Sequence, residues 1–319
     1  MAPLCIFLLI VLISASGSTA ETNVLLTGQT LSHQAKLSYA DTGVSLVMQH
    51  DCNLVTYNGQ GTPTWHTNTA GKGYRECILS FTDNGRLVVR NPNGGQMWIS
   101  SNANSKVGKY VAVLRPNGLV SIFGPAVWST AGIESNNSSE IVPSIKNLKN
   151  SPIVYNILFS GQVSIFGPAV WSTAGIESNN SSEIVPSIKN LKNSPIVYNI
   201  LFSGQVLYNN GKLSDNGYSF IMKDDCELAL ENSNGLVSWS TWTKGNGQNC
   251  FARLSYKGEL AVRADDYEPV WSNWASEEAP VGEYVLLMQQ NGEAVIYGPE
   301  VWTNKHDKSG FIKMPTSEK

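Results

Sequence analysis

The segment QHDCNLVTY at Gln49–Tyr57 alternates polar and apolar positions, and the reading of the fold starts from this pattern. Successive side chains of a strand point to opposite faces, so a strand here would gather its odd-numbered residues on one side. That side would present Gln49, Asp51, Asn53, Val55 and Tyr57, while Cys52 and Leu54 would enter a core. The segment therefore predicts a short strand with one buried and one open face.

Similar short segments precede six tryptophans that fall into two regular sets. Trp65, Trp98 and Trp128 are separated by 33 and 30 residues, and Trp239, Trp271 and Trp302 by 32 and 31. Asn-Gly, Asn-Pro and Gly-Pro pairs bound the segments, which is typical of short strands and hairpins. Three units that each deliver an indole to a common interior predict a closed, threefold all-β body in each half of the chain. A propeller or a sandwich would share this spacing.

The two halves of the chain are diverged copies of each other. The segment Asn23–Gln29 (NVLLTGQ) aligns with Asn199–Gln205 (NILFSGQ). Each half holds a pair of cysteines, Cys52 with Cys77 and Cys226 with Cys250, at spacings of 25 and 24 residues. One disulfide per half fits this symmetry, whereas the other two connectivities would tie the halves together.

A third repeat is of another kind, because residues 120–162 are identical to residues 163–205. Forty-three identical positions beside such diverged halves indicate a very recent duplication or an error of gene assembly, and we favour the error. We expect 120–130 to complete the first domain and 199–205 to open the second. The predicted domains then span 21–130 and 199–304, with a linker at 131–198 and a tail at 305–319.

The predicted linker contains Asn-x-Ser/Thr sequons, and its polar composition marks it as a place where a protease would cut. In a secreted chain such sequons are glycosylation candidates, although chance would also produce them in a stretch rich in Asn and Ser. The four asparagines are Asn136, Asn137, Asn179 and Asn180.

Residues 1–20 have the pattern of a secretory signal peptide. An apolar run at Leu4–Ile13 is followed by small residues up to Ala20. Ten apolar residues are too few to span a bilayer, and no later segment of the sequence is apolar for longer, so no membrane insertion is expected. Secretion favours oxidised cysteines. The expected location is the secretory pathway, ending outside the cell or in the vacuole.

Composition excludes several classes of protein. Lys plus Arg is 22 against 25 for Asp plus Glu, so the net charge of −3 offers no basic surface for nucleic acid. Only 15% of residues are charged, which nearly excludes an all-α protein because surface helices need charged faces. The four histidines, His33, His50, His66 and His306, lack metal-ligand spacing and a nucleophile motif beside them. We expect no enzyme activity, no metal and no cofactor.

The polar side of the Gln49–Tyr57 segment suits a neutral ligand with several hydroxyl groups. Asp51 accepts hydrogen bonds, Asn53 and Gln49 both donate and accept, and Tyr57 closes one end of the row. Neighbouring hydroxyls of a sugar are the natural complement. A polar strand that merely faces solvent would show the same spacing.

The pattern Gln-x-Asp-x-Asn-x-Val-x-Tyr resembles the signature of the monocot mannose-binding lectins, the bulb-type or snowdrop-agglutinin-like family. Gln49, Asp51, Asn53, Val55 and Tyr57 match it fully, and the resemblance extends over nearly all of both halves. It is closest to two-domain members, whose precursor is processed into two lectin subunits that then associate. The resemblance implies two tandem β-prism II domains, each with three four-stranded sheets around a pseudo-threefold axis. It also implies disulfides Cys52–Cys77 and Cys226–Cys250.

The resemblance further implies how a mannose would be held. Asp51 and Asn53 would bind the axial O2, Gln49 the O3 and Tyr57 the O4, with Val55 against the ring carbons. Glucose, whose O2 is equatorial, would leave these groups unpaired, at a penalty of about 1 to 3 kcal/mol.

The five other copies of the motif position depart from the pattern. One keeps enough of it to be a possible weak second site: Gln289, Asn291, Glu293, Val295 and Tyr297. The other four begin at Thr82, Arg115, Lys223 and Ser255 and do not look able to bind mannose in the family manner. One strong site per chain would bind weakly alone, so we expect a dimer or higher oligomer to provide avidity.

The sequence thus predicts a secreted, non-enzymatic lectin that binds mannose and mannose-rich glycans, with a role in plant defence. The alternative is a storage or protein-interaction protein that keeps the fold while most of its sugar sites are degenerate.

Overall fold

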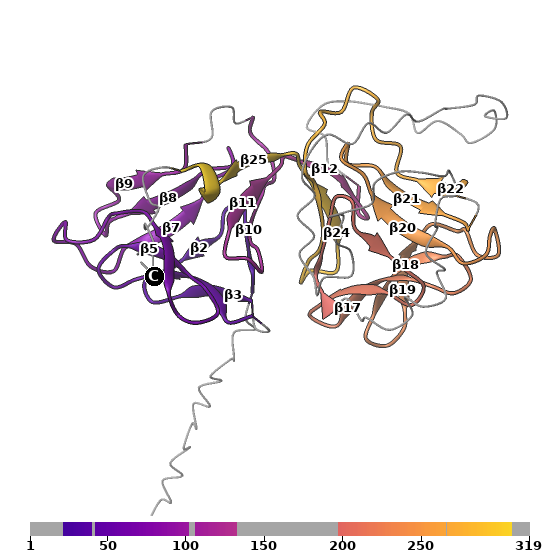
Figure 1. The fold of residues 1–319 in the computed structure, drawn as a ribbon, viewed down its shortest axis with the longest axis horizontal. Coiled ribbons are helices and arrows are strands. Elements are labelled where there is room, and N and C mark those ends of the chain that lie inside the picture. The colour runs from indigo at the N-terminus through magenta and orange to yellow at the C-terminus, as the bar shows by residue number, and fades with distance from the viewer. Residues whose placement is uncertain (1–21, 40–41, 102–105, 133–196, 266, 308–319) are drawn as a thin grey trace, which may run out of the picture.

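The computed structural model describes residues 22–39, 42–101, 106–132, 197–265 and 267–307. Within these residues the chain consists almost entirely of short strands, which form two bodies side by side (Figure 1). The predicted signal peptide at 1–20, the four sequons and nearly all of the predicted linker lie outside the described residues. So does the tail from residue 308 onward.

Three antiparallel sheets enclose the first body. The first sheet has the order β3 (Lys36–Tyr39), β4 (Val44–Met48), β5 (Leu54–Tyr57) and β6 (Pro63–His66). The second has the order β2 (Thr30–Leu31), β7 (Ile78–Phe81), β8 (Leu87–Arg90) and β9 (Gln96–Ile99). The third has the order β1 (Val24–Leu26), β10 (Val111–Leu114), β11 (Val120–Phe123) and β25 (Glu300–Thr303). Residues alternate between buried and half-buried along β4, as the sequence pattern predicts.

The second body repeats this arrangement. Its first sheet has the order β13 (Val197–Tyr198), β16 (Lys212–Asp215), β17 (Tyr218–Met222), β18 (Leu228–Asn232) and β19 (Val237–Ser240). Its second has the order β15 (Val206–Leu207), β20 (Phe251–Leu254), β21 (Leu260–Arg263) and β22 (Pro269–Ser272). Its third has the order β12 (Ala126–Ser129), β24 (Ala294–Tyr297), β23 (Val285–Met288) and β14 (Ile200–Phe202). The two-residue strand β13 is an addition to the expected four strands, and it pairs in parallel with β16.

Each body is completed by a strand from the other half of the chain. β25, near the end of the described chain, pairs with β11 in the first body, and β12 pairs with β24 in the second. We expected 120–130 to complete the first domain, but only β11 does so, because the chain crosses to the other body after Phe123. The limits 21–130 and 199–304 were drawn along the sequence and do not follow the exchanged strands. As domain boundaries they stay a prediction.

The crossings are made by two Gly-Pro pairs in equivalent places. Gly124–Pro125 lies between β11 and β12, Gly298–Pro299 lies between β24 and β25, and both peptide bonds are cis. Gly124 N–H donates to the Pro299 carbonyl at 3.3 Å, and Gly298 N–H donates to the Pro125 carbonyl at 3.4 Å. A side chain at position 124 would lie 2.5 Å from the ring of Tyr110, so the close approach requires glycine.

The exchange changes which tryptophans meet. Trp302 lies with Trp65 and Trp98 in the first body, at centroid distances of 6.3 and 6.0 Å. Trp128 lies with Trp239 and Trp271 in the second, at 5.5 and 6.2 Å. The prediction of three indoles in a common interior is confirmed, but the assignment of Trp128 and Trp302 was wrong because each is carried across on the exchanged strand. Edge-to-face contacts of this kind favour a fixed packing of the rings.

Within the described residues, strands of the 43-residue repeat come from the two ends of the duplicated region. β11 and β12 belong to residues 120–162, and β13 and β14 belong to residues 163–205. The alternative copies at 163–173 and 156–162 lie outside the described residues.

Both predicted disulfides are present, Cys52–Cys77 and Cys226–Cys250. All four cysteines are at most 1% exposed. Each disulfide joins the first sheet of its body to the second sheet. The first cysteine of each pair lies in a turn of the first sheet, and its partner directly precedes a strand of the second sheet, β7 or β20. Together with the three-sheet bodies, this defines two tandem β-prism II domains.

The third sheets of the two bodies pack against each other. Val111, Val113 and Phe123 of the first body share one buried cluster with Val285 and Leu287 of the second. Beside this cluster Arg115 pairs with Glu300 of its own body and with Glu283 of the other, and its guanidinium lies over the rings of Phe123 and Phe202. The outer faces of these two sheets are therefore largely closed to solvent. Among the described residues, no helix is long and apolar enough to cross a membrane.

Candidate functional site

The predicted site lies on the hairpin of β4 and β5, but its five residues do not form one strand. β4 ends at Met48 and β5 begins at Leu54, so Gln49–Asn53 is the turn between them. Gln49 N–H donates to the Asn53 carbonyl at 2.8 Å, which closes the turn. The expectation of a single strand was wrong because Asp51 reverses the chain: its Oδ1 accepts from the Asn53 N–H at 3.0 Å, as in an Asx turn.

The hairpin nevertheless brings the five side chains together on its outer face. The register pairs Val47 with Val55 and Ser45 with Tyr57, which places Gln49 opposite Asn53. Gln49 Nε2 donates to the Tyr57 hydroxyl at 2.5 Å, so these two side chains meet along the hairpin. Val55, between them in the ladder, is only 4% exposed, whereas Asp51 is exposed at the tip. The site is a short polar row that begins at the turn and ends at a phenol.

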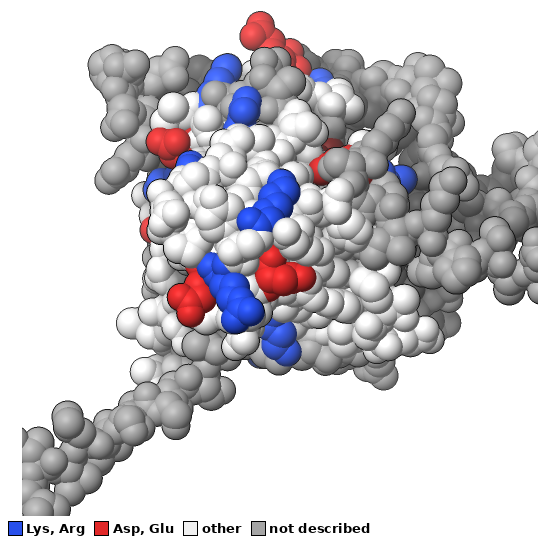
Figure 2. Space-filling view, turned by 90° about the vertical axis from the view of Figure 1, so that its left-hand side faces the viewer, with Lys and Arg blue, Asp and Glu red and all other residues white. Residues whose placement is uncertain are grey.

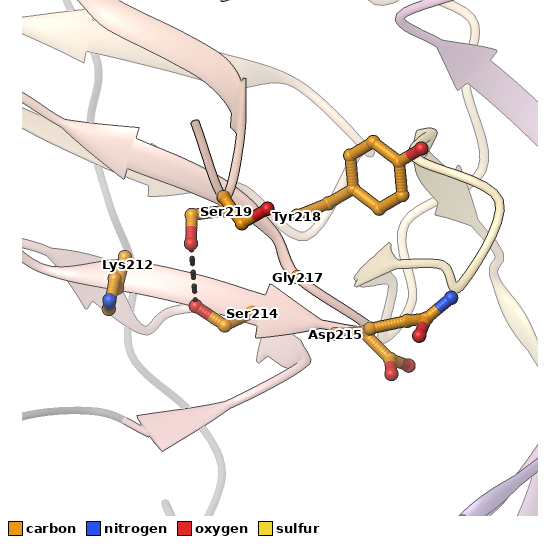
Figure 3. A pocket seen from close by; sticks show the side chains of 8 residues that line it. Lys212, Ser214, Asp215, Gly217, Tyr218 and Ser219 are labelled. Carbon is orange, nitrogen blue, oxygen red and sulfur yellow. Dashed lines mark hydrogen bonds between the residues drawn. The ribbon is translucent and has the colours of Figure 1, made fainter. Parts of the chain in front are cut away.

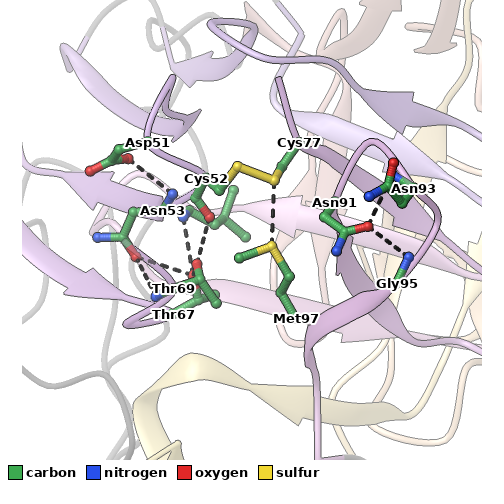
Figure 4. Close-up of a disulfide and its surroundings, with 11 residues drawn as sticks. Asp51, Cys52, Asn53, Thr67, Thr69, Cys77, Asn91, Asn93, Gly95 and Met97 are labelled. Atoms are coloured by element: carbon green, nitrogen blue, oxygen red, sulfur yellow. Dashed lines mark hydrogen bonds between the residues drawn. A yellow bond between two sulfur atoms is a disulfide. The ribbon is translucent and has the colours of Figure 1, made fainter. Parts of the chain in front are cut away.

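Two threonines in the segment that follows β6 orient the side chain of Asn53. Its Oδ1 accepts from the Thr69 N–H at 3.2 Å and from the Thr67 hydroxyl at 3.3 Å. Figure 4 shows that its amide nitrogen points away from both threonines. The side chain can therefore act only as a donor toward a ligand. In the same view one oxygen of Asp51 is bonded to the turn and the other points outward as an acceptor.

The disulfide restrains the Gln49–Asn53 turn on its buried side. Cys52 is fully buried and bonded to Cys77, and its backbone lies in the left-handed region with φ +71°. This conformation is unfavourable for a residue with a side chain. The Thr69 hydroxyl donates to the Cys52 carbonyl at 2.6 Å, which adds a second restraint. Asp51 and Asn53 thus flank a turn whose geometry is fixed before any ligand arrives.

The remaining hydrogen-bonding capacity of the row suits a neutral polyhydroxylated ligand. Asp51 and Gln49 each keep an oxygen that can accept, and Asn53 and Tyr57 each keep a hydrogen that can be donated. The end of the first body that faces the viewer in Figure 2 carries only scattered Lys, Arg, Asp and Glu side chains. Within the described residues, no group of three His, Cys, Asp or Glu side chains is arranged to hold a metal ion.

The matching hairpin of the second body has kept the end-to-end contact but changed its chemistry. Lys223 and Glu231 occupy the places of Gln49 and Tyr57, and Lys223 Nζ lies 2.7 Å from Glu231 Oε1. The hydrogen bond to Glu231 raises the pKa of Lys223 above its usual value, against the opposing effect of burial. An ion pair that is already satisfied offers less to sugar hydroxyls than the Gln49–Tyr57 pair does.

The possible second site at Gln289–Tyr297 is closed by the contact between the bodies. Gln289 Nε2 donates to the Tyr297 hydroxyl at 2.6 Å, as in the first site. However, Gln289 is 9% and Tyr297 2% exposed, and burial raises the pKa of the Tyr297 phenol well above its usual value. Val295 and Tyr297 belong to the cluster that the two bodies share. This burial argues against sugar binding there in this arrangement.

An open hollow of about 510 Å³ lies elsewhere on the second body, at the end of the β16–β17 hairpin. Figure 3 shows Ser214 and Ser219 bonded to each other within it, with Lys212 beside them and Asp215 at the turn. Burial raises the pKa of the Asp215 carboxyl, which Asn199 partly offsets by a hydrogen bond. None of the predicted site residues lines this hollow.

Sequence reasoning missed the two threonines that orient Asn53. The signal was present, because Thr67-x-Thr69 recurs as Thr241-x-Thr243 at the matching place of the second half. There the Thr243 hydroxyl donates to the carbonyl of Cys226, the counterpart of Cys52. A spaced threonine pair that follows each first-sheet hairpin is thus part of the scaffold of the site.

Comparison with known proteins agrees with the class that the fold and the site define, a two-domain all-β lectin. No family model matches the chain. It is 36% identical over 326 residues to the mannose-specific lectin CEA of Colocasia esculenta, covering 100% of both chains. It is also 36% identical to mannose-specific lectin 1 of Remusatia vivipara, covering 97% of this chain and 98% of the relative. Mannose-specific lectin 2 of Crocus vernus is 33% identical, with 96% and 97% covered.

A solved structure supports the fold alone. The fetuin-binding agglutinin of Scilla campanulata, a two-domain lectin, covers 88% of this chain and all of its own at a TM-score of 0.62 and 24% identity. The full-length relatives show the family plainly: the chain belongs to the monocot mannose-specific lectins. Lectins bind carbohydrate without converting it, so the family is not one of enzymes.

Proposed function

We propose that this chain binds mannose-containing glycans through the hairpin Gln49–Tyr57. The observation that carries the proposal is that this hairpin holds the complete set of five family residues, with Asp51 oriented by the turn and Asn53 by Thr67 and Thr69. Its relatives are named as mannose-specific lectins. Asp51 and Asn53 would receive the axial O2, Gln49 the O3, and Tyr57 the O4.

The test compares Asp51→Ala with Asn84→Ala in calorimetry with methyl α-mannoside and in retention on mannan-agarose. Asn84 occupies the same place in the neighbouring Thr82–Arg90 hairpin, whose sequence departs from the motif. We expect wild type and Asn84→Ala to bind alike, and Asp51→Ala to lose at least tenfold in affinity, because a sugar hydroxyl loses its acceptor. Undiminished binding by Asp51→Ala would refute the assignment of the site, and no binding by wild type would leave the storage alternative.

We also propose that binding strength in use comes from several sites acting together. One open motif per chain gives weak monovalent contact, and a dimer or higher oligomer would raise the apparent affinity without any new contact. A role in plant defence, through glycans of foreign or dietary surfaces, is proposed from the family resemblance. Light scattering of the purified protein, together with haemagglutination, would measure the valency.

The proposed maturation follows the divisions of the sequence: a signal peptide at 1–20, lectin domains at 21–130 and 199–304, a linker at 131–198 and a tail at 305–319. Two buried disulfides support passage through the secretory pathway, extracellular or vacuolar. Intact-mass spectrometry of the natural protein would report cleavage, glycosylation at Asn136, Asn137, Asn179 or Asn180, and the presence of the duplicated 43 residues.

A further inference from the structure

Two tryptophans of the second body lie almost entirely in solvent. Trp242 is 85% and Trp274 is 74% exposed. Each follows a core tryptophan by three residues, in the repeated pattern Trp239-Ser240-Thr241-Trp242 and Trp271-Ser272-Asn273-Trp274. The core members contact each other at 5.6 Å, so the interior is filled without the outer pair. Packing of the core does not account for these two large exposed side chains at repeated positions.

The turn geometry does not explain them. Trp242 and Trp274 have φ +57° and +52°, a left-handed conformation in which a bulky side chain is unfavourable. The matching turn of the first body places Asn68 there, at φ +56°, and asparagine tolerates this conformation better. The second body therefore carries a tryptophan at two turns whose backbone conformation disfavours it.

The backbone amide of each tryptophan is linked through one serine to a carboxylate of the degenerate motif. The backbone N–H of Trp242 donates to Ser240 Oγ at 3.4 Å, and Ser240 Oγ donates to Glu227 Oε1 at 2.9 Å. In the next sheet the backbone N–H of Trp274 donates to Ser272 Oγ at 3.0 Å, and Ser272 Oγ donates to Glu259 Oε1 at 3.0 Å. The same construction has thus been built twice.

The two glutamates occupy the place that Asn53 has in the mannose motif. Glu227 and Glu259 are half-buried, each directly before the second strand of its hairpin. The change from an amide that donates to a carboxylate that only accepts reverses the polarity of this position. These hairpins have lost the mannose motif, yet each carries a carboxylate that is linked through one serine to the backbone of an exposed tryptophan. Glu227 Oε2 also lies 3.8 Å from Lys223 Nζ, whereas no ion pair of Glu259 is present among the described residues.

We propose that Trp242 with Glu227, and Trp274 with Glu259, form two further saccharide sites for β-linked pyranosides whose ring hydroxyls are all equatorial. Such rings expose an unbroken face of C–H groups, which carry partial positive charge and stack on the negative face of an indole. Their equatorial hydroxyls then lie at the ring edge, where a carboxylate accepts. Mannose fits less well because its axial O2 interrupts one C–H face. The second body would thus recognise a different sugar class from the first.

The experiment measures binding of cellotetraose and of methyl α-mannoside by saturation-transfer NMR and calorimetry. The test variant is Trp242→Asn/Trp274→Asn, because Asn68 shows that this turn accepts asparagine. Leu236→Asn, a 67% exposed apolar residue of the same body, is the matched control. We expect cellotetraose to bind wild type, Leu236→Asn and Asp51→Ala alike, and to lose at least fivefold in affinity in the double variant. The single variants would each keep one site.

The mannose measurement separates this proposal from the function of the first body. Binding of methyl α-mannoside should be unchanged in the double tryptophan variant and lost in Asp51→Ala. The inference is overturned if wild type does not bind cellotetraose, if the double variant binds it as wild type does, or if Asp51→Ala abolishes it. Circular dichroism of the folded variants would verify that a loss comes from the removed indoles.

Discussion

Asn53 has two ends with different tasks. Its carbonyl oxygen is occupied by Thr67 and Thr69, and its amide nitrogen is directed away from them. The choice of asparagine over aspartate, which has the same shape, therefore decides whether the outward end donates or accepts. Asparagine and aspartate would pack alike here, so packing alone does not distinguish them.

We predict that Asn53→Asp keeps the fold and abolishes most of the mannose affinity. The retained oxygen still accepts from Thr69, but the outward oxygen cannot donate and lies near Asp51, so affinity should fall at least tenfold, or about 1.4 kcal/mol or more. Asn117→Asp, an exposed turn residue of the hairpin after β10, adds the same charge as a control. Calorimetry and melting temperatures measure both effects. Wild-type affinity in Asn53→Asp would show that the amide is not a donor to the sugar.

Sequence alone predicted which five side chains would form the candidate site, because residue type and spacing suffice to match a motif, and the structure places all five on one hairpin. It did not show how they are arranged. The bond between Gln49 and Tyr57 spans the hairpin, and it depends on the turn that Asp51 makes. Aspartate and asparagine are typical turn residues, so Asp51 and Asn53 did indicate that the chain reverses here. The strict alternation of polar and apolar residues led instead to the prediction of a continuous strand.

At the level of elements, the exchanged strands join the two bodies. β25 brings Trp302 into the first core, where it is 7% exposed, and β12 brings Trp128 to the second. Each strand supplies an edge of a sheet and a third of an aromatic cluster. The cores are therefore completed only when both halves of the chain are present.

We predict that Trp302→Ala destabilises the first body, although most of that body is built from residues 22–123. Removal of a buried indole should lower the free energy of unfolding by about 3 to 5 kcal/mol. Hydrogen exchange followed by mass spectrometry should accelerate in β6 and β9, while β19 and β22 stay protected. Trp128→Ala is the reciprocal variant and should show the opposite pattern. Faster exchange in β19 and β22 of Trp302→Ala would contradict the exchange of strands.

The hairpins, the tryptophan spacing and the disulfide in each half were predictable because they depend on local pattern and on symmetry. The exchange was not, since the two crossing segments read Gly-Pro-Ala-Val-Trp at Gly124–Trp128 and Gly-Pro-Glu-Val-Trp at Gly298–Trp302. Strands in such similar local settings fit either body. Only the position of the preceding chain decides which one each strand joins.

For the whole molecule, the interface between the bodies contains a charged group that makes it sensitive to pH. Arg115 contacts Glu283 and Glu300 at the edge of the shared apolar cluster, and its side chain is only 12% exposed. Burial raises the pKa of the Glu300 carboxyl above its usual value, while Arg115 opposes the shift. Because the folded protein holds the Glu300 proton more tightly than the unfolded chain, this group alone makes stability fall as the pH rises through the raised pKa.

We predict that Arg115→Met makes this fall steeper. Without the cation, the pKa of Glu300 rises further, so the variant should be nearly as stable as wild type at about pH 4 and lose about 3 kcal/mol by neutral pH. Denaturant unfolding across this range measures the difference. Arg90→Met, which removes a guanidinium that donates to the Gly94 backbone carbonyl, serves as the control. An equal loss at both ends of the pH range would exclude Glu300 as the responsible group.

The reciprocal strands also determine what can be produced as a fragment. A polypeptide cut off at residue 130 would carry Trp128 into solvent and leave β11 with an unpaired edge, which invites aggregation. A minimal unit bearing the Gln49–Tyr57 hairpin would have to be a graft, in which residues 22–123 are continued by the distant residues 299–304. Each half of the duplicated chain therefore supplies the strand that closes the other body.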